Sequence, residues 1–191
     1  MRKSGLASLA FFYCDFREDP KKERRGLLSS VLVQLCHQSD SYCDILSNLY
    51  FQHDKGSRQP SDNSLVQCLK DMMKLRGQAP VYLIVDGLDE CPNTHALPSP
   101  RRKVLLFVEE LINSKIPNLR ICVSSRPETD IKAVLEPLTF RSISLHDESG
   151  QTEDINSYIK SVVNTELSFR RWKEEDRQLV MDVLTKNAHG M

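Results

Sequence analysis

The sequence lacks an excess of charge of either sign and a long apolar segment. Lys and Arg together number 26, as do Asp and Glu, so the formal net charge at pH 7 is zero. Charge therefore predicts neither nucleic acid nor an anionic membrane as a partner. The longest mainly apolar stretches are Leu6 to Cys14 and Val81 to Val85. Both are far shorter than the roughly 20 residues that cross a bilayer, which predicts no transmembrane helix.

The cysteines form no C-x-x-C pair, and they are spread through the 191 residues. This distribution favours reduced thiols in a cytoplasmic protein over a disulfide framework. Cys91 and His95 have half of a zinc-site spacing, but no second half follows, so zinc is not predicted. The six cysteines are Cys14, Cys36, Cys43, Cys68, Cys91 and Cys122.

Short apolar runs alternate with segments of helical periodicity along the chain. Apolar runs closed by polar residues predict buried strands at 6–14, 81–86 and 119–125, and alternation predicts a weaker strand at 140–145. Apolar residues at helical spacing predict helices at 26–37, 42–51, 62–77, 104–112, 129–135, 152–163 and 174–184. The third helix has Asp62 or Ser64 as its expected cap. Strands that alternate with helices predict an α/β fold with a parallel sheet.

The stretch VYLIVDGLDEC places acids at the end of a predicted strand. In open parallel sheets, ligands bind beyond the carboxyl ends of the strands, where Asp86 is expected. A carboxylate there can hold Mg²⁺, and an acid one turn later, Asp89 or Glu90, can orient or deprotonate a water molecule. Gly87 lets the backbone approach a phosphate. The alternative is a strand end with solvated acids that begin a helix.

The stretch LRICVSSRPE, which follows the next predicted strand, places polar groups at the same edge. Ser125 and Arg126 can present a hydroxyl group and a guanidinium to the terminal phosphate of a nucleotide. The alternative is an ordinary turn, because Ser and Pro favour turns in any protein.

Four segments in this order carry a resemblance to a known family: FFYCDF, RRGLLSSVLVQL, VYLIVDGLDEC and LRICVSSRPE. The chain resembles the NACHT domain of signal-transducing (STAND) P-loop NTPases, most closely the nephrocystin-type N-terminal NTPase domain of fungal NOD-like proteins. The resemblance covers nearly all of the chain from about Leu6. It implies a three-layer P-loop NTPase-like fold, a parallel sheet flanked by helices, with Mg²⁺ and ATP or GTP as ligands.

The resemblance also implies a role for each site residue. Asp86 would be the Mg²⁺ acid of the Walker B motif. Asp89 and Glu90 would be the hydrolysis acids, with Glu90 as the base. Gly87, Ser125 and Arg126 would face the nucleotide, with Arg126 as the sensor 1 arginine.

The chain departs from that family at the phosphate-binding loop. The motif G-x-x-x-x-G-K-[ST] is missing, since none of the seven glycines is followed by Lys. The family pattern places the first strand, the P-loop and most of the first helix before Met1. The first strand would lie in the middle of the sheet, so its absence would leave a gap there. Residues 1–148 are therefore interpreted as a partial NTPase core, and residues 149–191 as a helical extension of the same domain.

Two hypotheses follow. The first is a cytoplasmic nucleotide switch whose isolated 191 residues do not bind or hydrolyse ATP, with nucleotide as a ligand once a P-loop is supplied upstream. The second is a non-catalytic fragment or a degenerate pseudo-NTPase, whose partners are other protein domains or a second copy. Neither predicts a nucleic-acid or membrane partner.

Overall fold

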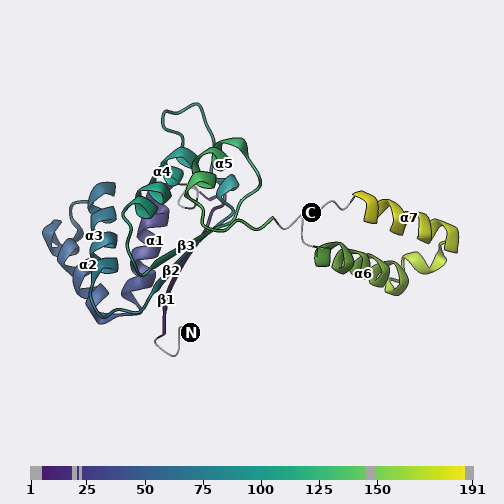
Figure 1. Cartoon of the computed structure of the whole chain (residues 1–191), viewed down its shortest axis with the longest axis horizontal. Helices are drawn as coiled ribbons and strands as arrows, with labels where there is room; N and C mark the ends of the chain where they lie inside the picture. The colour runs from purple at the N-terminus through teal and green to yellow at the C-terminus, as the bar shows by residue number, and fades with distance from the viewer. Residues whose placement is uncertain (1–5, 19–20, 22, 145–148, 188–191) are drawn as a thin grey trace. The chain divides into compact units, whose positions relative to one another are not determined.

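The computed structural model describes residues 6–18, 21, 23–144 and 149–187 (Figure 1). The chain divides into two compact units, Met1–Thr139 and Phe140–Met191. The elements of the first unit are β1 (Ser8–Tyr13), α1 (Arg24–Cys36), α2 (Asp40–Gln52), η3 (Asp54–Gly56), α3 (Asp62–Lys74), β2 (Val81–Asp86), η4 (Leu88–Glu90), α4 (Pro100–Asn113), β3 (Leu119–Val123), α5 (Thr129–Leu135) and η5 (Glu136–Leu138). The elements of the second are α6 (Ser149–Thr165), η7 (Phe169–Arg171) and α7 (Glu174–Asn187).

The three strands form a parallel sheet in the order β1-β2-β3. The register aligns Ser8 with Val81 and Val81 with Leu119, so the carboxyl ends of the strands meet at one edge. The predicted α/β class and parallel sheet are confirmed, and 81–86 is the central strand. The other two strands are shorter than predicted.

Within the first unit, the described residues cover only one face of the sheet. Ala10 and Leu83 are fully buried, whereas Tyr13 and Tyr82 on the opposite face are 57% and 42% exposed. Every α-helix of the first unit adds buried side chains to the cluster that covers the first face, and Figure 1 shows α1 to α4 on that side. The predictions of a three-layer fold and of strands buried on both faces are therefore wrong for this unit. All α-helices of this unit pack on one face of the sheet.

The helices follow the predicted apolar stripes. The buried residues of α1 are those expected from its spacing, and α3 buries both of its methionines. The predicted cap of α3, Asp62 or Ser64, is wrong. The cap is Ser61, whose hydroxyl accepts the Ser64 N–H at 3.1 Å. Ser99 caps α4 in the same way, with Pro100 in the first turn, where its missing N–H costs no hydrogen bond.

The outer edge of β1 is closed by two glutamine side chains of α1. Gln38 accepts the Leu9 N–H at 2.9 Å and donates to the Leu9 carbonyl at 2.8 Å. Gln34 does the same for Phe11, at 3.1 and 2.7 Å. The two amides thus make the hydrogen bonds that a further strand would make, and this edge is protected from pairing with another chain.

The predicted strand at 140–145 is wrong where the structure describes it. Residues 140–144 belong to no strand and are exposed, and Leu145 lies outside the described residues. Alternation alone does not make a strand without a sheet edge beside it, since a lone strand leaves its N–H and C=O groups unpaired.

The second unit is a pair of helices with a small core of its own. Its buried residues are Ile159, Val163 and Met181, from α6 and α7. That this unit extends the same domain stays a prediction. No described helix combines the length and the apolar composition needed to cross a membrane.

Candidate functional site

The predicted acids lie in one turn at the carboxyl end of the central strand. We call residues 86–90 the acidic turn. Asp86 ends β2, and Gly87 follows with φ of +67°, in the left-handed region that favours glycine. Leu88 is fully buried and anchors the turn, and in the short helix η4 Asp89 is partly buried and Glu90 is exposed.

The Asp86 carboxylate is held by Ser124, which follows β3. The Ser124 hydroxyl donates to Asp86 Oδ1 and accepts the Gly87 N–H at 3.1 Å. Ser125, the serine chosen from the sequence, is exposed, and the contact with Asp86 is made by its neighbour. No local sequence signal marks Ser124, because its contact with Asp86 depends on the register between β2 and β3. Ile84 aligns with Cys122, so two residues further Asp86 lies opposite Ser124.

Asp89 joins the two predicted site segments. Its Oδ1 accepts the Arg126 N–H at 3.0 Å, and its Oδ2 lies 3.6 Å from Arg126 Nε. The Asp89 carboxylate is 14% exposed and the Arg126 side chain 84% exposed. Arg126 is therefore attached through its backbone, while most of its side chain faces solvent.

Glu90 is exposed and lies over Gly87. A Cβ built on Gly87 would lie 3.8 Å from Glu90 Cγ and 3.6 Å from the Cys14 carbonyl oxygen, which are ordinary contacts. Glycine is needed here for its φ angle rather than for space. The structure thus brings Asp86, Gly87, Asp89, Glu90 and Arg126 together at one edge of the sheet.

Arg101, in the first turn of α4, supports the acidic turn from below and was not expected from the sequence. Its Nε donates to the Cys91 carbonyl at 2.9 Å and its Nη2 to the Asp89 carbonyl at 2.6 Å. Its Nη1 lies 3.3 Å from Asp130 Oδ1 in α5. The only available signal was a cation at a helix N-terminus, where the helix dipole disfavours it.

Two buried cysteines lie under the same turn. Cys14 follows β1, where its N–H donates to the Asp86 carbonyl at 2.9 Å, and Cys91 follows η4. The thiols interact, and this contact together with burial raises the pKa of Cys14. The Cys14 thiol, as a hydrogen-bond donor, lowers the pKa of Cys91, and the Arg101 charge adds to that effect.

The residues present fit a magnesium ion better than a metal held by protein alone. No group of three or more His, Cys, Asp or Glu side chains with metal-binding geometry occurs among the described residues. Mg²⁺ in nucleotide sites takes one or two carboxylates, and phosphates and water fill the remaining positions. Asp86, oriented by Ser124, can be such a ligand.

A comparison with protein families matches residues 1–126 to the family described as Nephrocystin 3, N-terminal. The match covers more than half of the chain. The chain belongs to this family. The nephrocystin 3 N-terminal match includes all three strands and ends at Arg126, so it contains every predicted site residue. No curated protein and no solved structure matches the chain. The nephrocystin-type resemblance is confirmed, and the NACHT assignment stays a prediction.

Proposed function

We propose that this nephrocystin-type chain is part of a NACHT-like, STAND-class nucleotide switch of the cytoplasm, similar to the fungal NOD-like NTPases. It would carry the Walker B and sensor 1 regions. One observation carries the proposal: two carboxylates of the acidic turn contact the residues that directly follow β3. Ser124 joins Asp86 to that segment, and Asp89 binds the Arg126 N–H at 3.0 Å.

Each side chain has a distinct role in this proposal. Asp86 would hold Mg²⁺, which supplies charge neutralisation for the nucleotide phosphates. Glu90 would accept a proton from the attacking water molecule, and Asp89 would orient it while fixing Arg126. Arg126, whose side chain is 84% exposed and lies 3.6 Å from Asp89 Oδ2, would turn towards a terminal phosphate. Gly87 and Ser125 would line the same space.

The nucleotide itself, ATP or GTP, would need a phosphate-binding loop that these 191 residues do not contain. A P-loop supplies backbone N–H groups and a Lys that the acidic turn cannot replace. We therefore expect the isolated chain to bind nucleotide weakly or not at all.

The test compares hydrolysis by a version of the protein that carries an upstream P-loop with hydrolysis by its Asp86→Ala and Glu90→Gln variants. Both substitutions should abolish Mg-dependent turnover. Lys103→Gln, an exposed change on α4, is the matched control and should leave it unchanged. Turnover that survives both site substitutions would refute the role assignment. A thermal melt of the 191-residue chain should not respond to millimolar Mg·ATP.

A second candidate function is association with protein rather than nucleotide. The uncovered face of the sheet, with Tyr13 and Tyr82 exposed, favours it because contiguous exposed apolar residues often mark interaction sites. The partner would be another protein domain or a second copy of the chain. Glu90-dependent hydrolysis by the 191-residue chain would refute this candidate.

A further inference from the structure

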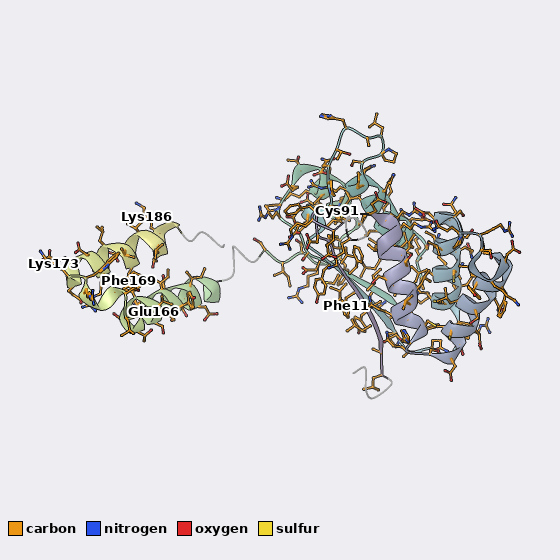
Figure 2. All side chains as sticks on the ribbon, turned by 180° about the vertical axis from the view of Figure 1, so that it is seen from behind. Phe11, Cys91, Glu166, Phe169, Lys173 and Lys186 are labelled. Carbon is orange, nitrogen blue, oxygen red and sulfur yellow. The ribbon has the colours of Figure 1, made fainter. Side chains whose placement is uncertain are left out.

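The segment that follows β1 lies beside the acidic turn. In the register of the sheet, Tyr13 aligns with Asp86, and the next residue, Cys14, donates its N–H to the Asp86 carbonyl at 2.9 Å. In Figure 2, β1 rises past Phe11 towards Cys91, which directly follows the acidic turn. The residues after Cys14 therefore leave the sheet at the same edge as the predicted site residues.

This segment carries an arginine whose position is fixed by an aspartate. Arg17 donates to the two carboxylate oxygens of Asp15 from Nε at 2.9 Å and from Nη2 at 2.8 Å, and its backbone N–H donates to Oδ1 at 2.9 Å. The Glu18 N–H donates to the Asp15 carbonyl at 3.2 Å, which closes a tight turn. The Asp15 side chain is 14% exposed and that of Arg17 is 73% exposed. The aspartate thus holds one edge of the guanidinium, and the rest of it faces solvent.

Arg126 has a similar arrangement on the other side of the acidic turn. It follows β3, its side chain is 84% exposed, and it contacts the Asp89 carboxylate, which is 14% exposed. Because the strand order is β1-β2-β3, the acidic turn after β2 lies between the two arginines. The hydrogen bonds to Asp15 raise the pKa of Arg17, and the charge of Glu90 adds to this effect. Two exposed guanidinium groups, each attached to a shielded carboxylate, therefore flank the acidic turn.

We propose that Arg17 is a further phosphate-binding residue of the nucleotide site, and that Arg17 and Arg126 contact the polyphosphate chain from opposite sides of the acidic turn. This inference rests on the proposed nucleotide function. A polyphosphate carries several negative charges along its length, and the guanidinium fork matches the geometry of phosphate oxygens. The carboxylates of the acidic turn alone would repel such a ligand. Cations on both sides offset that repulsion, in addition to the Mg²⁺ that Asp86 would hold.

The alternative is that Arg17 only stabilises its own turn through Asp15. A purely structural role predicts that loss of the guanidinium changes stability and leaves nucleotide affinity unchanged. The two roles are separable because Arg17 is mostly exposed, so its substitution removes little packing. Affinity and stability therefore have to be measured on the same variants.

The experiment measures nucleotide binding by the P-loop-containing version of the protein, with isothermal titration calorimetry. The probe is the magnesium complex of AMPPNP, an ATP analogue that is not hydrolysed. Arg17→Ala should raise the Kd at least tenfold. Arg17→Lys should raise it at least threefold, because lysine keeps the charge and loses the planar fork. Thermal melts of the unliganded variants report stability, and Arg17→Lys carries the test if Arg17→Ala does not fold.

Arg58→Ala is the matched control. Arg58 also forms an ion pair with an aspartate, Asp54, at 2.6 Å, and its side chain is 67% exposed, but it lies in the loop between α2 and α3. Its substitution removes the same charge and should leave the Kd within twofold of that of the unsubstituted protein. An equal loss of affinity in Arg17→Ala and Arg58→Ala would assign the effect to net charge and overturn the inference.

Failure of this inference is distinguishable from failure of the proposed function. If the unsubstituted protein binds Mg·AMPPNP and folded Arg17→Ala binds it within twofold as tightly, Arg17 does not contact the phosphates and the inference is overturned. If the unsubstituted P-loop-containing protein does not bind Mg·AMPPNP, the proposed nucleotide function itself is refuted.

Discussion

At the scale of single residues, one hydroxyl group holds the acidic turn against β3. Ser124 satisfies both the Gly87 N–H and the Asp86 carboxylate, so Ser124→Ala removes two hydrogen bonds. We expect a loss of about 1–2 kcal/mol in the free energy of unfolding, measured by urea denaturation. Ser125→Ala is the matched control, because both serines are exposed but the bonds to Asp86 and Gly87 are made by Ser124, and it should stay within about 0.5 kcal/mol of the wild type. Equal losses for the two serines would contradict the observed register.

A second residue-scale prediction concerns pH. The guanidinium and the N–H of Arg17 both donate to the Asp15 carboxylate at 2.8–2.9 Å, and they lower the pKa of Asp15 to about 2. In the unfolded chain the value is about 3.9. Because the folded pKa is the lower one, the stabilisation is complete above the unfolded value and is lost as the pH falls through about 2.

The measurement is an NMR titration of the Asp15 carboxyl group. Arg17→Ala should move its midpoint part of the way towards 3.9, since it removes the side-chain hydrogen bonds that are the largest cause of the shift and keeps the backbone N–H bond. A midpoint near 3.9 in the wild-type protein would show that the pair does not persist in solution.

At the scale of elements, the two long edges of the sheet differ. The edge of β1 is closed by Gln34 and Gln38, whereas β3 is the last described strand on the other side. Directly after β3, the Ser124 N–H donates to the Val85 carbonyl and the Ser124 carbonyl accepts the Leu88 N–H, at 3.0 Å each, so both groups face the β2 side. Residues of a parallel strand alternate in this direction, so Ile121 and Val123 direct theirs outward. This is the edge at which the resemblance predicts a further strand.

The glutamine pair gives an element-scale prediction. Gln34→Ala/Gln38→Ala leaves four N–H and C=O groups of Leu9 and Phe11 without these partners. We expect a loss of about 2–4 kcal/mol in urea denaturation and faster aggregation on heating, because an edge strand becomes open to pairing. Gln67→Ala on α3 is the control, since its amide contacts only exposed Asp71. Equal aggregation of both variants would argue against the role of the amides.

The elements that could be predicted from the sequence are those fixed by local pattern. The run of apolar residues before Asp86 gave the central strand with its bounds, and helical spacing gave α1 and α3, since both signals lie within one element. The acids and Arg126 were found because they follow strands directly. Ser124 was missed because its role depends on register between strands, and Arg101 because its partners are backbone carbonyls of another loop. The uncovered face could not be predicted, since it depends on where every helix packs.

At the scale of the whole molecule, zero net charge coincides with an uncovered apolar face on the sheet. Leu9, Phe11 and Ile84 lie on that face with Tyr13 and Tyr82, and all are at least partly exposed. Repulsion between molecules is weakest when the net charge is zero, which for this composition is near pH 7. Contact between the apolar sheet faces of two molecules should then not be opposed by charge repulsion.

We therefore predict self-association that is strongest near pH 7 and weaker towards pH 9, measured by light scattering of the 191-residue chain. Tyr82→Glu places a charge in the centre of the uncovered face and should lower the association at pH 7 at least fivefold, with little change in the unfolding free energy. Leu97→Glu adds the same charge at a fully exposed loop position and separates the effect of the face from that of net charge. If both variants dissociate equally, net charge alone controls association. A Tyr82→Glu effect well beyond that of Leu97→Glu assigns it to the sheet face.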